Sequence, residues 1–437
     1  MIDKFIYKIK ELIKQPFKIG IVSYYYPIGK SGNNGVALHS YYLSRELAKK
    51  GYDIHIFTKT EKKFTKKEYL GKGRIIIHGI ETVVDSKISD PVANKRMNYF
   101  IYDHRVIDEI SKENKKSSFD VIHTHGWLTA GAFIAKNLNR VPWVHTFHAL
   151  EKNRIKFMTP EEKKYFQIAR WMESTINHAD AVISVSEHLR EESMEEYEIK
   201  DRRTFVIPNG VDHKIFFRDK NIEKKKQVLY VGRFSLEKGV DLIPGIAQNV
   251  LDSNPNVRFI VVASNSHTPE SLKNVSKQFE YLEETYKERF KWIREPISST
   301  ELAKLYNESI IYMQPSRYEA FGMTILEAMA CGCCVITSNK GGIPEVVSDA
   351  GEVIPLNTAL FSRKIKVLLE NYRLREKYSK KAIEQAEKFG WEEISERVLG
   401  IYDSVGKNSS KSRDQKKEEM GDMITELEKI SGLDKKQ

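Results

Sequence analysis

Residues 310–330 read I-I-Y-M-Q-P-S-R-Y-E-A-F-G-M-T-I-L-E-A-M-A, and this stretch says most about the fold. Ile310–Gln314 is a short apolar run, which predicts a buried strand. From Phe321 to Ala330 the apolar residues recur at spacings of three and four, which predicts a helix. Glu319 therefore stands on a strand-to-helix turn, and Glu327 lies about two turns into the helix.

The two carboxylates of this stretch suit a ligand that carries both hydroxyl groups and negative charge. Free backbone N–H groups and the positive end of the helix dipole would lie beside Glu319. Carboxylates accept hydrogen bonds from sugar hydroxyls, while the N–H groups can face a phosphate. The alternative is that Glu319 only caps the helix and Glu327 is a solvated surface residue. The spacing alone favours neither.

A second loop, residues 232–239, reads G-R-F-S-L-E-K-G and follows a predicted strand at Gln227–Val231. A helical pattern follows from Val240, so Arg233 and Lys238 are predicted to lie beside a helix N-terminus. A cation there is unfavourable by ~0.3–1 kcal/mol. Two such cations indicate a bound anion, most simply a diphosphate. The alternative is a surface loop with solvated charges.

Composition limits the classes of protein that fit. The chain has 437 residues, 41% of them hydrophobic, and a net charge of +11. No apolar run approaches the ~20 residues that span a bilayer. The first residues lack an apolar signal-peptide core, so we expect a cytoplasmic protein. No nucleic-acid-binding motif is visible. The three cysteines, all within 331–334, are interpreted as small core residues.

Short apolar strands alternate with amphipathic helices along the chain, which predicts an α/β protein with mostly parallel sheets. The pattern is interrupted near residues 211–226 and restarts at Gln227, so we expect two doubly wound halves. Both marked loops directly follow strands, where parallel sheets bind ligands. The other predicted strands are 17–23, 53–58, 74–80, 119–124, 144–147, 181–185, 204–207, 258–263, 333–337 and 352–354, and the predicted helices include 36–49, 98–111 and 161–177.

In order and spacing, these segments resemble glycosyltransferase family 4, which has the GT-B fold of two Rossmann-like domains facing across a cleft. The resemblance covers nearly the whole chain. The matching segments are 119–126, 145–148, 179–186 and 206–212 in the first half, and 232–239, 315–322, 327–332 and 341–345 in the second.

The sequence pattern and the resemblance together predict five segments. They are a basic amphipathic helix at 1–15, an acceptor-side Rossmann-like domain at 16–215, a nucleotide-sugar-binding Rossmann-like domain at 216–386, a C-terminal crossover helix at 387–405 and a polar tail at 406–437.

The resemblance also implies a retaining, hexosyltransferase-type enzyme that transfers a sugar from a nucleoside diphosphate. Arg233 and Lys238 would stabilise the charge on the departing diphosphate. Glu319 would contact the sugar hydroxyls, and Glu327 the ribose. No Asp-x-Asp motif occurs, so we expect no metal and no cofactor beyond the donor. Gly232 and the backbone of Phe321, Gly322 and Met323 complete the expected donor site.

In the first half, Gly35 is expected to approach the diphosphate. The family has paired glycines here, and Asn34 replaces the first. His148 matches the family's histidine beside the reacting carbon, so we count it with Glu319, Arg233 and Lys238 as catalytic. His123 and His125 are predicted to lie on the acceptor side.

The acceptor is the least defined part. Ile2, Phe5, Ile6, Ile9, Leu12 and Ile13 fall on one helical stripe flanked by lysines, as in helices that lie on anionic membranes. This pattern favours a hydroxyl acceptor in glycolipid or surface-glycan synthesis, and peripheral association with the cytoplasmic membrane face. The alternatives are a soluble-acceptor enzyme of the sucrose- or trehalose-synthase sort and a catalytically inactive GT-B scaffold. Residues 264–269 replace the family's glycine-rich turn, so the nucleotide is left open.

Overall fold

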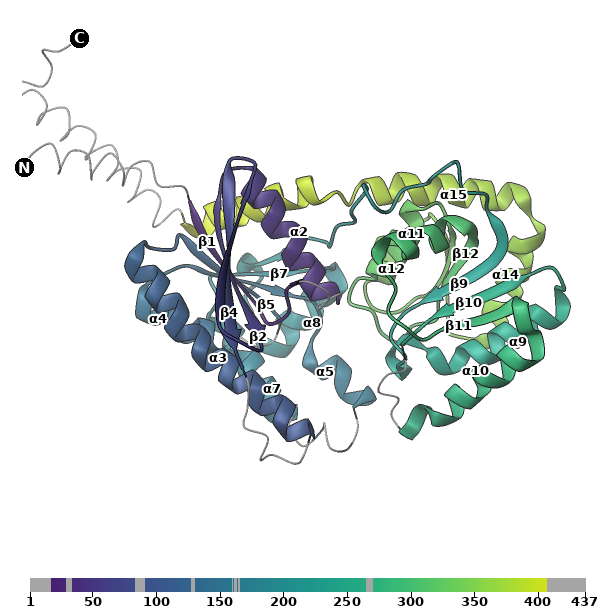
Figure 1. Cartoon of the computed structure of the whole chain (residues 1–437), viewed down its shortest axis with the longest axis horizontal. Coiled ribbons are helices and arrows are strands. Elements are labelled where there is room, and N and C mark those ends of the chain that lie inside the picture. The colour runs from purple at the N-terminus through teal and green to yellow at the C-terminus, as the bar shows by residue number, and fades with distance from the viewer. Residues whose placement is uncertain are drawn as a thin grey trace, which may run out of the picture. The chain divides into compact units, whose positions relative to one another are not determined.

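The computed structural model describes residues 17–28, 34–82, 91–126, 130–158, 160, 163, 166–264 and 270–406. Their contacts define two compact units. The first falls within Met1–Thr146, Trp171–Ile183 and Ser395–Gln437, and the second within Phe147–Arg170 and Ser184–Ile394. Each half of the chain is built on a sheet covered by helices, as Figure 1 shows.

The first sheet has eight strands in the order β3-β4-β2-β1-β5-β6-β7-β8. Strand β3 runs antiparallel to β4. The neighbouring pairs β4–β2, β2–β1, β1–β5 and β5–β6 are all parallel. The strands are β1 (Lys18–Ser23), β2 (Asp53–Thr60), β3 (Phe64–Leu70), β4 (Gly73–Glu81), β5 (Val121–His125), β6 (Trp143–Phe147), β7 (Ala181–Ser184) and β8 (Thr204–Val206).

Helices connect these strands as the sequence pattern predicts. They are α2 (Gly35–Lys49), α3 (Pro91–Lys116), α4 (Ala130–Asn139), α5 (Glu151–Arg154), α7 (Phe166–Ser174) and α8 (Glu187–Tyr197). Residues 391–406 form a further helix. Its Tyr402 is fully buried, and the Tyr402 hydroxyl contacts His123 Nδ1 at 2.6 Å. The C-terminal helix is thus part of the first unit's core.

The second sheet has six strands in the order β11-β10-β9-β12-β13-β14, all paired in parallel. The strands are β9 (Lys225–Val231), β10 (Arg258–Val262), β11 (Phe290–Ile293), β12 (Ser309–Gln314), β13 (Cys334–Ser338) and β14 (Glu352–Ile354). The helices are α9 (Ile243–Ser253), α10 (Lys273–Tyr286), α11 (Ser299–Glu308), α12 (Met323–Ala330), α13 (Ile343–Val347), α14 (Thr358–Glu370) and α15 (Tyr372–Glu387). Val228, Tyr230 and Phe259 are among its fully buried core residues.

The structure differs from the sequence predictions in a few elements. Strands β3 and β11 were not predicted. Helix α12 begins at Met323, so Glu327 is its fifth residue and lies about one turn in, not two. The three cysteines are buried and free, as expected. The amphipathic pattern of residues 1–15 and the tail beyond residue 406 lie outside the described residues.

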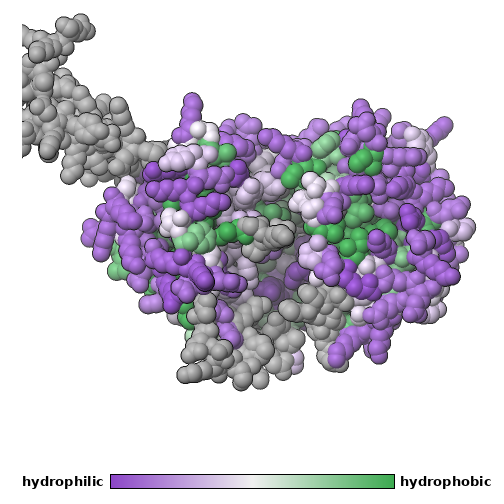
Figure 2. Space-filling view, in the orientation of Figure 1, coloured by the Kyte–Doolittle hydropathy of each residue, from purple (hydrophilic) through white to green (hydrophobic). Residues whose placement is uncertain are grey.

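Hydrophilic side chains cover much of the face seen in Figure 2, with hydrophobic residues in separate patches. Within the described part of the chain, no helix has both the length and the apolar character that crossing a membrane requires.

Candidate functional site

The loop after β9 is held in place by Tyr230, which is fully buried. The Tyr230 hydroxyl can donate a hydrogen bond to the Arg233 carbonyl oxygen, at 3.4 Å, or to the Lys238 carbonyl oxygen, at 3.3 Å. A Cβ on Gly232 would come within 2.6 Å of the Tyr230 hydroxyl oxygen, so a larger residue there would displace the Tyr230 side chain. Sequence analysis missed Tyr230 because a tyrosine in a strand gives no sign of what its hydroxyl contacts.

Four charged side chains meet at this loop. Lys238 Nζ lies 2.8 Å from Glu319 Oε1 and 3.3 Å from Glu237 Oε1. Arg233 Nη2 donates to both carboxylate oxygens of Glu237, at 2.9 and 2.8 Å. Burial would raise the pKa of Glu237, but Lys238 and Arg233 hold that pKa below its ordinary value. The structure therefore brings the two predicted cations and Glu319 into one cluster.

The structure adds two details to the prediction of cations beside a helix N-terminus. Residues Leu236–Lys238 and Val240–Leu242 form 3-10 turns, and α9 begins only at Ile243. Each cation also has a carboxylate partner in Glu237. Glu237 lies within the quoted loop, and its position between Arg233 and Lys238 was the signal that it would pair with them.

The turn that carries Glu319 is fixed by close backbone contacts. Arg317 N–H donates to the Glu237 carbonyl oxygen at 2.8 Å, which joins this turn to the loop after β9. Gly342 N–H donates to the Glu319 carbonyl oxygen at 2.9 Å. Gly341 has φ +60°, and a Cβ there would lie 1.9 Å from the same oxygen. The two glycines let the β13–α13 loop pass directly against the backbone of Glu319.

Helix α12 starts beside Glu319 as the sequence predicts. Gly322, with φ +109°, is its N-cap residue, and Met323 is its first residue. Phe321 is buried at 4% exposure, so its side chain packs inward and only its backbone remains for a ligand. The N-terminal turn of α12 thus begins with a glycine between the buried Phe321 and the half-buried Met323, which leaves backbone open to a ligand.

Glu327 lies one turn further along α12 and is 7% exposed. Burial raises the pKa of Glu327 to about 8, although a hydrogen bond from the Tyr306 hydroxyl, at 3.1 Å, opposes the shift. The carboxyl group is therefore mainly protonated at neutral pH. The ribose contact predicted for Glu327 stays a prediction.

The predicted residues of the first half lie at the start of α2 and at the ends of β5 and β6. Asn34 caps α2 by accepting a hydrogen bond from Ala37 N–H at 2.9 Å, with an extended backbone rather than a left-handed one, and Gly35 is the first helical residue. His125 ends β5 and is buried, and His148 directly follows β6 and is half-buried.

His123 lies deeper in the first unit and is fully buried. Its Nδ1 faces the Tyr402 hydroxyl and its Nε2 faces Thr146 Oγ1 at 2.7 Å. Burial lowers the pKa of His123 well below its ordinary value. These contacts give His123 a packing role, and its acceptor-side role, like the roles of His125 and His148, stays a prediction.

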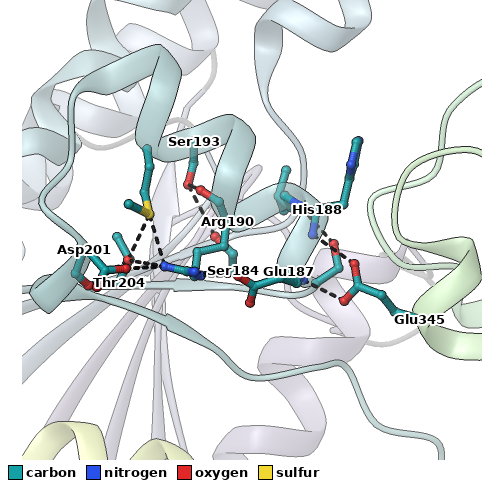
Figure 3. A network of polar contacts seen from close by, with 11 residues as sticks. Ser184, Glu187, His188, Arg190, Ser193, Asp201, Thr204 and Glu345 are labelled. Carbon is teal, nitrogen blue, oxygen red and sulfur yellow. Dashed lines mark hydrogen bonds and ion pairs between the residues drawn. The ribbon is translucent and has the colours of Figure 1, made fainter.

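Glu345, which the quoted motif contains but to which we gave no role, contacts the start of α8 (Figure 3). Its two carboxylate oxygens accept hydrogen bonds from Glu187 N–H at 2.7 Å and His188 N–H at 2.9 Å. Ser186 Oγ also donates to the Ala320 carbonyl oxygen at 2.7 Å. Glu345 thus satisfies free N–H groups of a helix N-terminus and has a structural role.

Comparison with known proteins identifies the class to which this fold and this charged loop belong. A family model described as Glycosyltransferase Family 4 matches residues 33–215, and one described as Glycosyl transferases group 1 matches residues 212–385. Solved glycosyltransferase structures share the two-sheet architecture, which is the GT-B fold. The chain belongs to the family-4 glycosyltransferases.

Individual relatives cover most of the chain. The alpha-maltose-1-phosphate synthase of Mycolicibacterium smegmatis is 28% identical over 323 residues, which is 68% of this chain and 82% of the relative. The structure of sucrose-phosphate synthase from Thermosynechococcus elongatus has a TM-score of 0.71 at 21% identity, covering 89% of this chain and 98% of that one. That of Anabaena Alr3699/HepE in complex with UDP and glucose has a TM-score of 0.63 at 17% identity, covering 89% and 100%.

Proposed function

We propose that this glycosyltransferase takes its sugar from a nucleoside-diphosphate sugar and transfers it to an acceptor hydroxyl with retention of the anomeric configuration, without a metal ion. The observation that carries the proposal is the contact of Lys238 with Glu319, at 2.8 Å, beside Arg233. The carboxylate that we assign to the sugar hydroxyls thus lies next to the cations that we assign to the diphosphate. The UDP complex of the Anabaena relative supports a nucleotide donor.

The charges around Lys238 suit a group that becomes more negative during the reaction. Without donor, the charges of Lys238 and Arg233 balance those of Glu237 and Glu319. An ammonium has three N–H donors, and the two carboxylates engage two of them. The third can meet the diphosphate as the glycosidic bond breaks. Arg233 is 60% exposed along its side chain and can turn to the same group. Fixed cations that meet developing charge lower the barrier.

The remaining predicted residues take supporting roles in this proposal. Glu319 orients the donor sugar by accepting hydrogen bonds from its hydroxyls. The backbone from Phe321 to Met323, with Gly322 at its centre, donates to sugar and phosphate. Glu327 meets the ribose, Gly35 approaches the diphosphate, and His148 lies beside the reacting carbon.

For the acceptor, we propose a hydroxyl group of a glycolipid or surface glycan, because the pattern of residues 1–15 suits an anionic membrane surface. The second candidate is a soluble sugar phosphate. Two relatives favour it, since they are named as synthases of maltose-1-phosphate and sucrose phosphate.

The test is a two-step assay. Thermal-shift measurements against UDP-, GDP- and ADP-sugars identify the donor, because a ligand that binds only the folded state raises Tm. The selected donor is then incubated with lipid-linked glycans and with sugar phosphates, and NMR gives the anomeric configuration of the product. Retention supports the proposal. An inverted product, or no stabilisation by any nucleotide-sugar, contradicts it.

A further inference from the structure

The first unit contains a cavity of about 460 Å³ that the proposed transfer reaction does not use. Its lining includes Lys18 and Asp53, which are the first residues of β1 and β2, and the C-terminal turn of α3. The loop that carries Asn34 and Gly35 follows the opposite, carboxyl end of β1. The cavity therefore lies at the amino ends of the parallel strands, away from the edge where such sheets bind substrates.

Two histidines and a glutamate from three different elements meet at this cavity. His55 Nδ1 lies 2.9 Å from His78 Nε2 and 3.9 Å from Glu113 Oε2. The three potential ligand atoms all lie within 4.8 Å of one another. His55 and His78 are each 3% exposed. Two imidazoles that face each other in this way share a single proton, which a metal ion can replace.

Charged neighbours orient the His55 ring and the Glu113 carboxylate, as the residues around a metal's ligands commonly do. His55 Nε2 faces Asp53 Oδ1 at 3.7 Å, and Arg74 fixes that carboxylate through bonds of 2.7 and 2.6 Å. A proton on His55 Nε2 then leaves a lone pair on Nδ1, toward His78 and Glu113. Lys116 Nζ binds Glu113 Oε1 at 2.6 Å, so Oε2 is the oxygen that faces the histidines. At 3.7 Å the contact of His55 Nε2 with Asp53 is electrostatic and not a hydrogen bond, but it sets the same orientation as the carboxylate partner that a ligating histidine commonly has.

We propose that His55 Nδ1, His78 Nε2 and Glu113 Oε2 form a binding site for one zinc-type divalent transition-metal ion, with water from the cavity as the fourth ligand. Two imidazoles and one carboxylate are a ligand set that Zn²⁺ takes in proteins. Tetrahedral Zn²⁺ needs nitrogen ligands roughly 3.3 Å apart, for Zn–N bonds of about 2.0–2.1 Å. A movement of a few tenths of an ångström at His78 achieves this.

Of the four described cations that line the cavity, Lys67 is exposed to solvent and the other three are already engaged, which argues against an anion as the occupant. Arg74 is engaged by Asp53, and Lys116 by Glu113. Lys18 Nζ donates to the carbonyl oxygens of Glu113 and Ser117 at 3.0 and 2.7 Å. Arg74, Lys116 and Lys18 already have oxygen partners. The ring nitrogens of His55 and His78, in contrast, face each other with one proton between them, and a cation can take the place of that proton. A metal ion there would tie β2, β4 and α3 together, which is a stabilising role and not a catalytic one.

The test uses the tag-free full chain, treated with EDTA and then dialysed free of chelator. Co²⁺ is added first, because its four-coordinate complexes have strong visible absorption bands, and Zn²⁺ is then used to displace it. We expect one Co²⁺ per chain and a rise in Tm with Zn²⁺. His55→Gln and His78→Gln should each weaken binding at least ~10-fold. His104→Gln is the matched control, because His104 lies exposed on α3 and should change nothing.

A second variant covers the case in which the buried histidine variants do not fold. Glu113 lies on α3 and lines the cavity, with its side chain 12% exposed, so Glu113→Gln should fold. Loss of Co²⁺ absorption in Glu113→Gln, retained in His104→Gln, supports the proposal. No saturable one-to-one binding by the wild type, or equal affinity in the Glu113→Gln and His104→Gln variants, overturns it. None of these measurements depends on sugar transfer.

Discussion

At the residue scale, Lys238 is the most confined cation of the proposed donor site, with its side chain 13% exposed between two carboxylates. We expect Lys238→Ala and Arg233→Ala each to lower turnover at least ~100-fold, because each removes a fixed charge that stabilises the departing diphosphate. Steady-state rates with the preferred donor provide the measurement.

A matched control separates this effect from a general loss of positive charge. Lys220 is exposed on the second unit and lies outside the charged loop, so Lys220→Ala should keep full turnover. Circular dichroism should show that all three variants are folded. A near-normal kcat in both Lys238→Ala and Arg233→Ala would rule out the diphosphate assignment.

Glu327 gives a second prediction at the same scale, because its pKa rises from an ordinary 4.5 to about 8 on burial. Between these pH values the unfolded chain loses the proton while the folded chain keeps it. The unfolded state is therefore favoured as pH rises, and the free energy of unfolding falls by up to roughly 1.4 kcal/mol per pH unit. Glu327→Gln cannot lose a proton and should escape this dependence.

Urea unfolding at pH 5.5 and pH 7.5 tests the Glu327 prediction. The free energy of unfolding of the wild type, relative to Glu327→Gln, should be lower at the higher pH. An equal difference between the two proteins at both pH values would show that the carboxyl group is already ionised in the folded state.

At the scale of elements, the β13–α13 loop positions Glu319 through Gly341. Alanine there would place its Cβ 1.9 Å from the Glu319 carbonyl oxygen and would also be strained at φ +60°. We expect Gly341→Ala to lower the free energy of unfolding by ~1–3 kcal/mol and to raise the KM for the donor, because the Glu319 backbone must move. Urea unfolding and donor kinetics measure the two effects.

Gly400 offers the matched control for this substitution. It lies exposed in helix 391–406, and a Cβ there would meet no atom within 4 Å. Gly400→Ala should therefore raise stability by up to ~1 kcal/mol, since alanine favours the helix. If Gly341→Ala were equally harmless, the close approach to Glu319 would not determine the turn's conformation.

Elements with a strong local pattern were predictable from sequence. The apolar run at β12 and the spacing of three and four in α12 placed Glu319 between them, and the strand before the second loop was predicted to end at Val231, where β9 ends. Strand β3 was missed because it is a polar, largely exposed edge strand whose identity depends on pairing with β4. The start of α9 was misplaced because two 3-10 turns continue the helical spacing without being α-helix.

The candidate site was predictable in its residues but only in part in their partners. Arg233, Lys238 and Glu319 carry charges that a sequence displays directly. The pairing of Glu237 with both cations is local, and its position between them signals it. That Tyr230 supports the loop and that Glu345 caps α8 depends on contacts that the sequence does not display. The histidine pair at β2 and β4 gave no sequence signal either, because the register of two parallel strands brings it together.

At the scale of the whole molecule, sugar transfer and metal binding should separate. We expect turnover to persist in excess EDTA, because Lys238 and Arg233 supply the positive charge that a metal would otherwise bring to the diphosphate. Tm should fall in the same solution if His55, His78 and Glu113 hold a metal ion. Complete loss of turnover on chelation, restored by Mg²⁺ or Mn²⁺, would contradict the metal-independent mechanism.

The last prediction concerns residues 1–15 and decides between the two acceptor classes. If their apolar stripe binds a membrane, the purified protein should co-sediment with anionic liposomes, and added salt should weaken this by screening the lysines. Replacing Phe5 and Ile9 by serine should reduce co-sedimentation further, because each apolar side chain contributes ~1.5–3 kcal/mol of burial. Donor hydrolysis, which needs no lipid, should be nearly unchanged in the double variant and serves as the folding control.

If the variant instead loses donor binding, the segment is a structural part of the first half of the chain. A soluble sugar phosphate would then become the better-supported acceptor, because the membrane proposal rests on this segment alone.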